Sequence, residues 1–115
     1  MSPQSYLTST GKKIFKVIYQ HCQEKGIADD IDTFELSMLA NAFDVFATNA
    51  ALGNKKGFFN EFKNGTVQVN AYHTICKDNY SVIMKHSPKF GLNPSDREKI
   101  TKISKPEDDD NFDDL

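Results

Sequence analysis

The strongest constraint on the fold is a regular apolar pattern in residues 33–52. Apolar side chains recur there at intervals of three and four: Leu36, Leu39, Ala40, Phe43, Phe46, Ala47 and Ala50. This spacing places one face of a helix against a core. Asp32 precedes the pattern as an N-cap and Gly53 follows it as a stop. The sequence therefore predicts a helix over 33–52.

Three more helices are predicted. The first begins at a cap among residues 8–10 and ends before Gly26, a residue suited to left-handed backbone. Another begins after a cap at Asn70 and reaches about His86. The last spans 94–104, because an asparagine followed by proline supplies a cap and a first-turn residue.

The Asn64-Gly65 pair predicts a short β-hairpin between the second and third helices. It separates an aromatic run from an alternating one at 66–69, and Asn-Gly favours a type I′ turn with positive φ at both central residues. Two strands alone are barely stable in water, so the hairpin is expected to lie on the helices or on a neighbouring subunit. The predicted fold class is mainly α, a small domain of about four helices with this hairpin.

Acidic and basic residues are distributed unevenly along the chain. Residues 107–115 contain six acidic side chains and no basic one, whereas 1–106 contain 14 Lys and Arg against the other 10 acids, a net charge of +4. We therefore expect a flexible leader over 1–7, a helical domain over 8–105 and an acidic disordered tail over 106–115, which is too charged and too poor in apolar groups to fold alone.

The sequence indicates a cytoplasmic protein with no membrane segment. No apolar run approaches the roughly 20 residues of a bilayer span, and the first residues lack the basic and apolar regions of a signal peptide. Cys22 and Cys76 fit this compartment as reduced, packed thiols.

Motifs for catalysis or metal binding are lacking. The sequence has no phosphate-binding loop of the Walker type, no G-x-S-x-G and no H-E-x-x-H. His73 and Cys76 are three residues apart, but no C-x-x-C or H-x-x-x-H pair accompanies them. The acids at 29–32 are better explained as helix caps than as paired catalytic carboxylates. We expect no enzyme activity, no metal and no cofactor.

Basic residues form three groups: Lys12, Lys13 and Lys16; Lys55 and Lys56; and Lys85, Lys89, Arg97, Lys99, Lys102 and Lys105. A solvated surface explains most single lysines, but helices with clustered lysines also contact phosphates without reading sequence. The connection between the first two predicted helices is too long for a helix-turn-helix.

The acidic tail has three possible roles. It keeps the chain soluble, docks on a basic partner through Asp108, Asp109, Asp110, Phe112 and Leu115, or competes with DNA for the lysines.

The segment 90–100 resembles the F-G-L-x-P-x-x-R signature of one family of phage terminase small subunits, through Phe90, Gly91, Leu92, Pro94 and Arg97. The order of the upstream elements is also similar to that family, over roughly residues 7–103. Two features depart from its pattern: Ala71 stands where proline is expected after Val-Asn, and the region after the signature is very short.

The resemblance implies a homo-oligomeric ring that binds double-stranded viral DNA and regulates or recruits the large terminase subunit, which carries the ATPase and nuclease, in the host cytoplasm. We expect the DNA-facing surface to contain either Lys12, Lys13 and Lys16, or Lys85, Arg97 and Lys102. Expected contacts between subunits are Phe43, Ala47, Phe58, Phe59 and Phe62. The alternative interpretation is a protein–protein adaptor with an acidic docking tail and no DNA binding.

Overall fold

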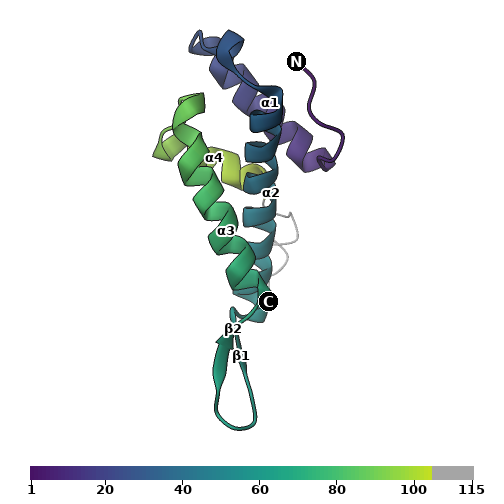
Figure 1. The fold of residues 1–115 in the computed structure, drawn as a ribbon, viewed down its shortest axis with the longest axis vertical. Helices are drawn as coiled ribbons and strands as arrows, with labels where there is room; N and C mark the ends of the chain where they lie inside the picture. Colours follow the sequence, from purple (N-terminus) through teal and green to yellow (C-terminus); the bar gives the residue numbers. More distant parts are fainter. Residues whose placement is uncertain (105–115) are drawn as a thin grey trace, which may run out of the picture.

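The computed structural model describes residues 1–104, which form four α-helices and one hairpin (Figure 1). The elements are α1 (Ser9–Glu24), α2 (Thr33–Lys56), β1 (Phe59–Glu61), β2 (Val67–Val69), α3 (Ala71–His86) and α4 (Pro94–Ile103). Short 3-10 turns, η1 (Ala28–Asp30) and η2 (Ser87–Phe90), join α1 to α2 and α3 to α4. The predicted fold class is confirmed.

Side-chain caps explain where the helices begin. The hydroxyl of Thr8 accepts a hydrogen bond from Gly11 N–H, and the carboxylate of Asp32 accepts one from Phe34 N–H at 2.7 Å. Asn93 and Asp96 form a reciprocal capping box at the start of α4. Each cap satisfies backbone donors that have no partner within the helix.

The predicted end of α2 at Gly53 is wrong. The helix continues to Lys56 and ends at Gly57, whose φ is 94°. Gly53 is buried inside the helix, where a Cβ atom would lie 2.1 Å from Cε1 of Phe58. Glycine is present at this position because the Phe58 ring occupies the space of a side chain.

The hairpin is confirmed, but its turn differs from the prediction. Strands β1 and β2 are antiparallel, with Phe59 opposite Val69 and Glu61 opposite Val67. Among residues 1–104 only glycines have positive φ, so Asn64 does not adopt a type I′ conformation. The loop has three residues, and Gly65 alone, at φ 85°, supplies the left-handed step.

A core of buried side chains from all four helices holds the upper part of the molecule together. Its members are Leu7, Ile14, Phe15, Ile18, Cys22, Leu36, Leu39, Ala40, Ala42, Phe43, Ile83, Phe90, Leu92 and Ile100. Leu7 is buried and Gln4 N–H donates to the Ser37 hydroxyl at 3.1 Å, so the end of the leader is anchored on α2. The flexibility expected of residues 1–7 stays a prediction.

Residues 48–82, which we call the arm, extend away from this core. The arm comprises the last nine residues of α2, the hairpin and most of α3, with the hairpin at its tip (Figure 1). Gly53 is the only buried residue of the arm. The molecule is therefore elongated, measuring 56 × 31 × 27 Å. Within residues 1–104, no helix has both the length and the apolar character that crossing a bilayer requires.

Candidate functional site

The signature segment forms a tight turn that ends η2 and leads into α4. Phe90 and Leu92 are buried on either side of Gly91, whose φ of 66° is left-handed. The backbone N–H of Leu92 donates to the carbonyl oxygen of Ser87 at 3.2 Å and closes the turn. A residue with a Cβ is strained in this conformation, which explains the glycine.

The end of α1 binds the backbone of this turn. The Lys25 ammonium donates to the carbonyl oxygen of Gly91 at 2.7 Å, and Nε2 of His21 lies 3.0 Å from the same oxygen. The thiol of Cys22 donates to the carbonyl oxygen of Phe90 at 3.6 Å. Burial raises the pKa of the Cys22 thiol and so keeps it protonated as a donor. The signature turn is thus a joint between α1 and α4.

Arg97, a predicted DNA contact, takes part in the same joint. Its Nη1 donates to the carbonyl oxygen of Leu92 at 3.2 Å, and the residue is half-buried. The structure therefore gives Arg97 a role in holding the turn, which leaves less of its guanidinium for a phosphate.

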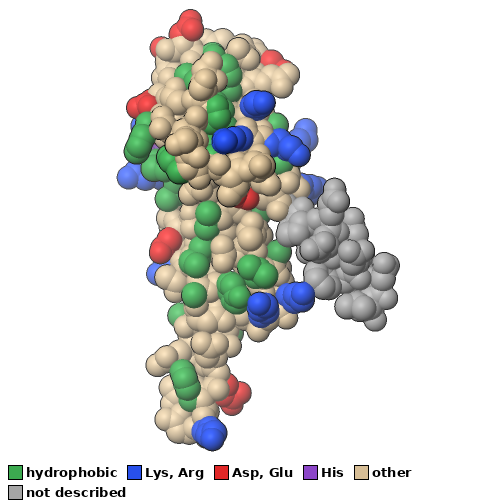
Figure 2. All heavy atoms as spheres, turned by 90° about the vertical axis from the view of Figure 1, so that its right-hand side faces the viewer, with side chains coloured by type: hydrophobic (Ala, Val, Ile, Leu, Met, Phe, Trp, Pro, Cys, Tyr) green, Lys and Arg blue, Asp and Glu red, His purple; other side chains and the backbone are tan. Residues whose placement is uncertain are grey.

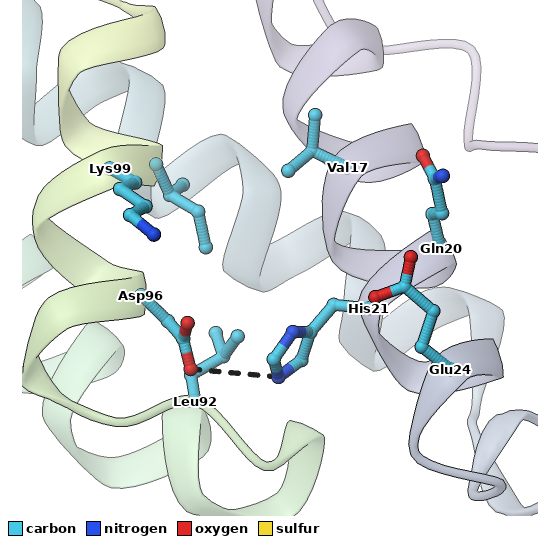
Figure 3. Close-up of a pocket in the computed structure, with 8 residues that line it drawn as sticks. Val17, Gln20, His21, Glu24, Leu92, Asp96 and Lys99 are labelled. Carbon is cyan, nitrogen blue, oxygen red and sulfur yellow. Dashed lines mark ion pairs between the residues drawn. The ribbon is translucent and has the colours of Figure 1, made fainter.

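A cleft of about 410 Å³ separates α1 from α4 (Figure 3). Its walls are Val17, Gln20, His21, Glu24, Leu92, Asp96, Lys99 and Ile100. Nε2 of His21 and Oδ2 of Asp96 approach to 3.6 Å across it. Two carboxylates, one imidazole and one ammonium line the cleft together with three aliphatic side chains, and its walls include no serine, threonine or cysteine. In residues 1–104, no group of three His, Cys, Asp or Glu side chains could hold a metal ion.

The predicted DNA contacts lie on three helices. Lys12, Lys13 and Lys16 are exposed in the first half of α1. Figure 2, which faces the side where α1 begins, shows Lys and Arg side chains gathered on the upper part of the molecule. Lys85 is exposed near the end of α3, whereas Lys102 on α4 is paired with Glu98 at 3.3 Å. The three lysines of α1 thus share one half of a helix, whereas Lys85, Arg97 and Lys102 are divided between α3 and α4.

The predicted subunit contacts divide between the core and the arm. Phe43 and Ala47 are buried within the chain's own core region, where they serve the fold. Phe58 is half-buried over Gly53, whereas Phe59 and Phe62 are 62% and 48% exposed. The exposed surface of the arm continues through Val67, Val69 and Tyr80, and apolar side chains are visible along it in Figure 2.

Sequence reasoning missed an ion-pair cluster near the start of α2. One carboxylate oxygen of Glu35 lies 2.7 Å from His86 Nδ1 and 3.1 Å from Lys89 Nζ. The hydrogen bond from His86, followed by the interactions with Lys89, lowers the pKa of the Glu35 carboxyl. These residues are 51 or more positions apart, so no local pattern in the sequence could have joined them.

The tail residues proposed for partner binding, Asp108, Asp109, Asp110, Phe112 and Leu115, lie outside the described residues.

Residues 11–107 match a protein family described as phage terminase, small subunit. No curated protein and no solved structure matches the chain.

Proposed function

The chain belongs to the phage terminase small-subunit family, a non-catalytic component of genome packaging, and from this premise we propose that it binds viral DNA and recruits the large terminase subunit. The observation that carries the proposal is the family match over residues 11–107, which covers α1 from its third residue and all of α2, α3 and α4. The resemblance of the signature turn at 90–97 to the same family supports it independently of charge or composition.

The proposed DNA-facing surface is the first half of α1. Lys12, Lys13 and Lys16 are exposed there, and among residues 1–104 none of their ammonium groups is paired with a carboxylate. Three cations in the first turns of a helix oppose its dipole, a small local cost that a phosphate ligand would offset. Contacts of this kind fix a protein on duplex DNA without reading its sequence.

The arm is the proposed contact between subunits. Phe59, Val67 and Val69 share one face of the hairpin, because opposite and alternate residues of a two-stranded ribbon point to the same side. All three are at least 49% exposed. An isolated two-stranded ribbon is marginally stable, so a neighbouring copy that covers this face would stabilise it.

Repetition makes a weakly basic chain an effective DNA-binding protein. A closed ring presents the same lysines many times, and each copy needs to contribute only one or two phosphate contacts for the assembly to bind firmly. Head-to-tail contacts between different faces of the subunit generate such a ring. Each copy in such a ring would add the net charge of +4 of its residues 1–106.

A gel-shift titration of duplex DNA over a range of salt concentrations tests the proposal. The logarithm of the binding constant should fall linearly with the logarithm of salt concentration, by about 0.9 for each phosphate contacted. Native mass measurement on the same sample should show an oligomer. A protein that stays monomeric and ignores duplex DNA at low salt would overturn the proposal and favour the adaptor interpretation.

A further inference from the structure

We propose that the acidic tail, residues 106–115, occupies the lysines of α1 in the absence of DNA and acts as an internal competitor for that surface. The inference rests on the proposed DNA-binding function and names a regulator of the same site. Three observations carry it: the direction of α4, the position of Lys13 on α1, and the opposite charges of the two segments.

Helix α4 runs antiparallel to α1. Asp96, in the first turn of α4, faces His21 near the end of α1, with 3.6 Å between Oδ2 and Nε2. One turn further along α4, Ile100 lines the cleft together with Val17, one turn earlier in α1. Figure 3 shows these two helices on opposite sides of the cleft. The next turn of α4, at Ile103 and Ser104, therefore comes level with the first turns of α1.

This antiparallel course directs the end of α4 towards the half of α1 that contains the lysines. Ser104 is buried and Ile103 packs against the core, so the end of α4 is fixed in place. Lys13 precedes Val17 by four residues and lies on the same stripe of α1, which is the stripe that faces α4. Glu107 follows Ser104 by three residues, at most about 10 Å of extended chain. The acids at 108–114 can then reach Lys12 and Lys16.

Charge decides which surface the tail would bind. Six acids lie within residues 107–115 with no base among them, and α1 has three exposed lysines, with no acidic side chain in its first turn. A single exposed ion pair is weak, because water and salt screen it. Because the tail is joined to the same chain, however, its effective concentration is of the order of millimolar. A duplex bound by many subunits would displace it, whereas a single phosphate contact would not.

Binding of duplex DNA by three forms of the full oligomer tests the inference: the intact chain, a chain ending at Pro106, and the pair variant Asp109→Asn/Asp110→Asn. The chain ending at Pro106 should bind at least about threefold more tightly at low salt, a gap that closes as screening increases. The matched control is Asp29→Asn/Asp30→Asn, which changes net charge equally at the other end of α1. If the two pair variants raised the affinity for duplex DNA equally, net charge rather than the tail would explain the change, and the inference would be overturned.

A second measurement needs no DNA. Carbodiimide joins carboxylates to ammonium groups in direct contact, and mass spectrometry locates the linked residues. Links from the tail should fall on Lys12, Lys13 and Lys16 and be lost at high salt, with Lys63, in the hairpin loop, as the distant control. Links spread evenly over all exposed lysines would overturn the inference even if DNA binding is confirmed. If the tail were linked only to α1 lysines but the protein did not bind DNA, the proposed function would be contradicted, whereas the contact between the tail and α1 would stand.

Discussion

The ring of Phe58 lies against Gly53, inside the last turns of α2, at a distance that leaves no room for a Cβ atom. This contact joins the end of the helix to the start of the hairpin. Glycine normally weakens a helix, but at position 53 the contact with the Phe58 ring requires it.

Replacing Gly53 with alanine should destabilise the protein by about 1–3 kcal/mol, the range for overpacking, although the same change in an open helix stabilises by about 1 kcal/mol. Urea unfolding measures the effect. Gly11→Ala is the matched control, because Gly11 is also buried in a helix but a Cβ there would meet Leu7 at an ordinary 3.4 Å. In a Phe58→Ala background, Gly53→Ala should no longer lower the free energy of unfolding. An equal loss with and without the Phe58 ring would show that the contact is not the cause.

Gly91→Ala should destabilise the signature turn by about 1–2 kcal/mol through left-handed backbone strain. Gly26→Ala is the control: its φ of 74° is similar, but nothing lies within 4 Å of a Cβ at that position. At Gly91 a Cβ would also lie 3.0 Å from Cδ of Lys25. Chemical denaturation should therefore show a larger loss for Gly91→Ala than for Gly26→Ala, and the reverse order would contradict this account.

Glu35 should stabilise the protein above acidic pH. Its folded pKa is lowered by His86 and Lys89, so its contribution is present above the unfolded pKa and is lost as pH falls through the folded pKa. At about pH 6, Glu35→Gln should cost about 1 kcal/mol of unfolding free energy, a charged hydrogen bond reduced for partial exposure. The difference should shrink as pH falls and vanish below the folded pKa, because the native carboxyl is then protonated as well. A difference independent of pH would contradict the ion-pair account.

Charge reversal should distinguish the two basic groups. Lys12→Glu/Lys13→Glu/Lys16→Glu should reduce the salt slope of DNA binding by about 0.9 for each phosphate that a subunit no longer neutralises. Lys85→Glu/Lys99→Glu/Lys102→Glu carries the same change in net charge and should have the smaller effect. If the second variant reduced DNA affinity as much as the first, net charge rather than α1 would account for binding.

Polar substitutions on the hairpin should weaken assembly without unfolding the subunit. Phe59→Ser/Val69→Ser removes exposed apolar area, so each subunit should keep its helix content while native mass measurement shows smaller species at a given concentration. Asn60→Ser/Gln68→Ser, from the opposite face of the ribbon, is the control. An unchanged mass for the first variant would remove the hairpin from the subunit contact.

Local patterns predicted the helices and the hairpin well, because caps and apolar spacing act within a few residues. Gly53 misled the prediction, since a glycine that ends a helix and one that admits a distant ring look the same in sequence. The turn at Gly91 could be located in the sequence from the family signature. Its contacts with His21 and Lys25 could not be predicted, because they span 66 or more residues. The cluster of Glu35 with His86 was invisible for the same reason.

The arm has one buried residue among those from 48 to 82, so its backbone hydrogen bonds are protected by little apolar packing. Amide hydrogens in the hairpin and the adjoining turns of α2 and α3 should exchange with solvent far sooner than those around Phe15 and Leu39, through opening that leaves the core intact. If exchange in the arm slows at higher protein concentration, the slowing at each amide would measure how strongly association between subunits protects that part of the arm.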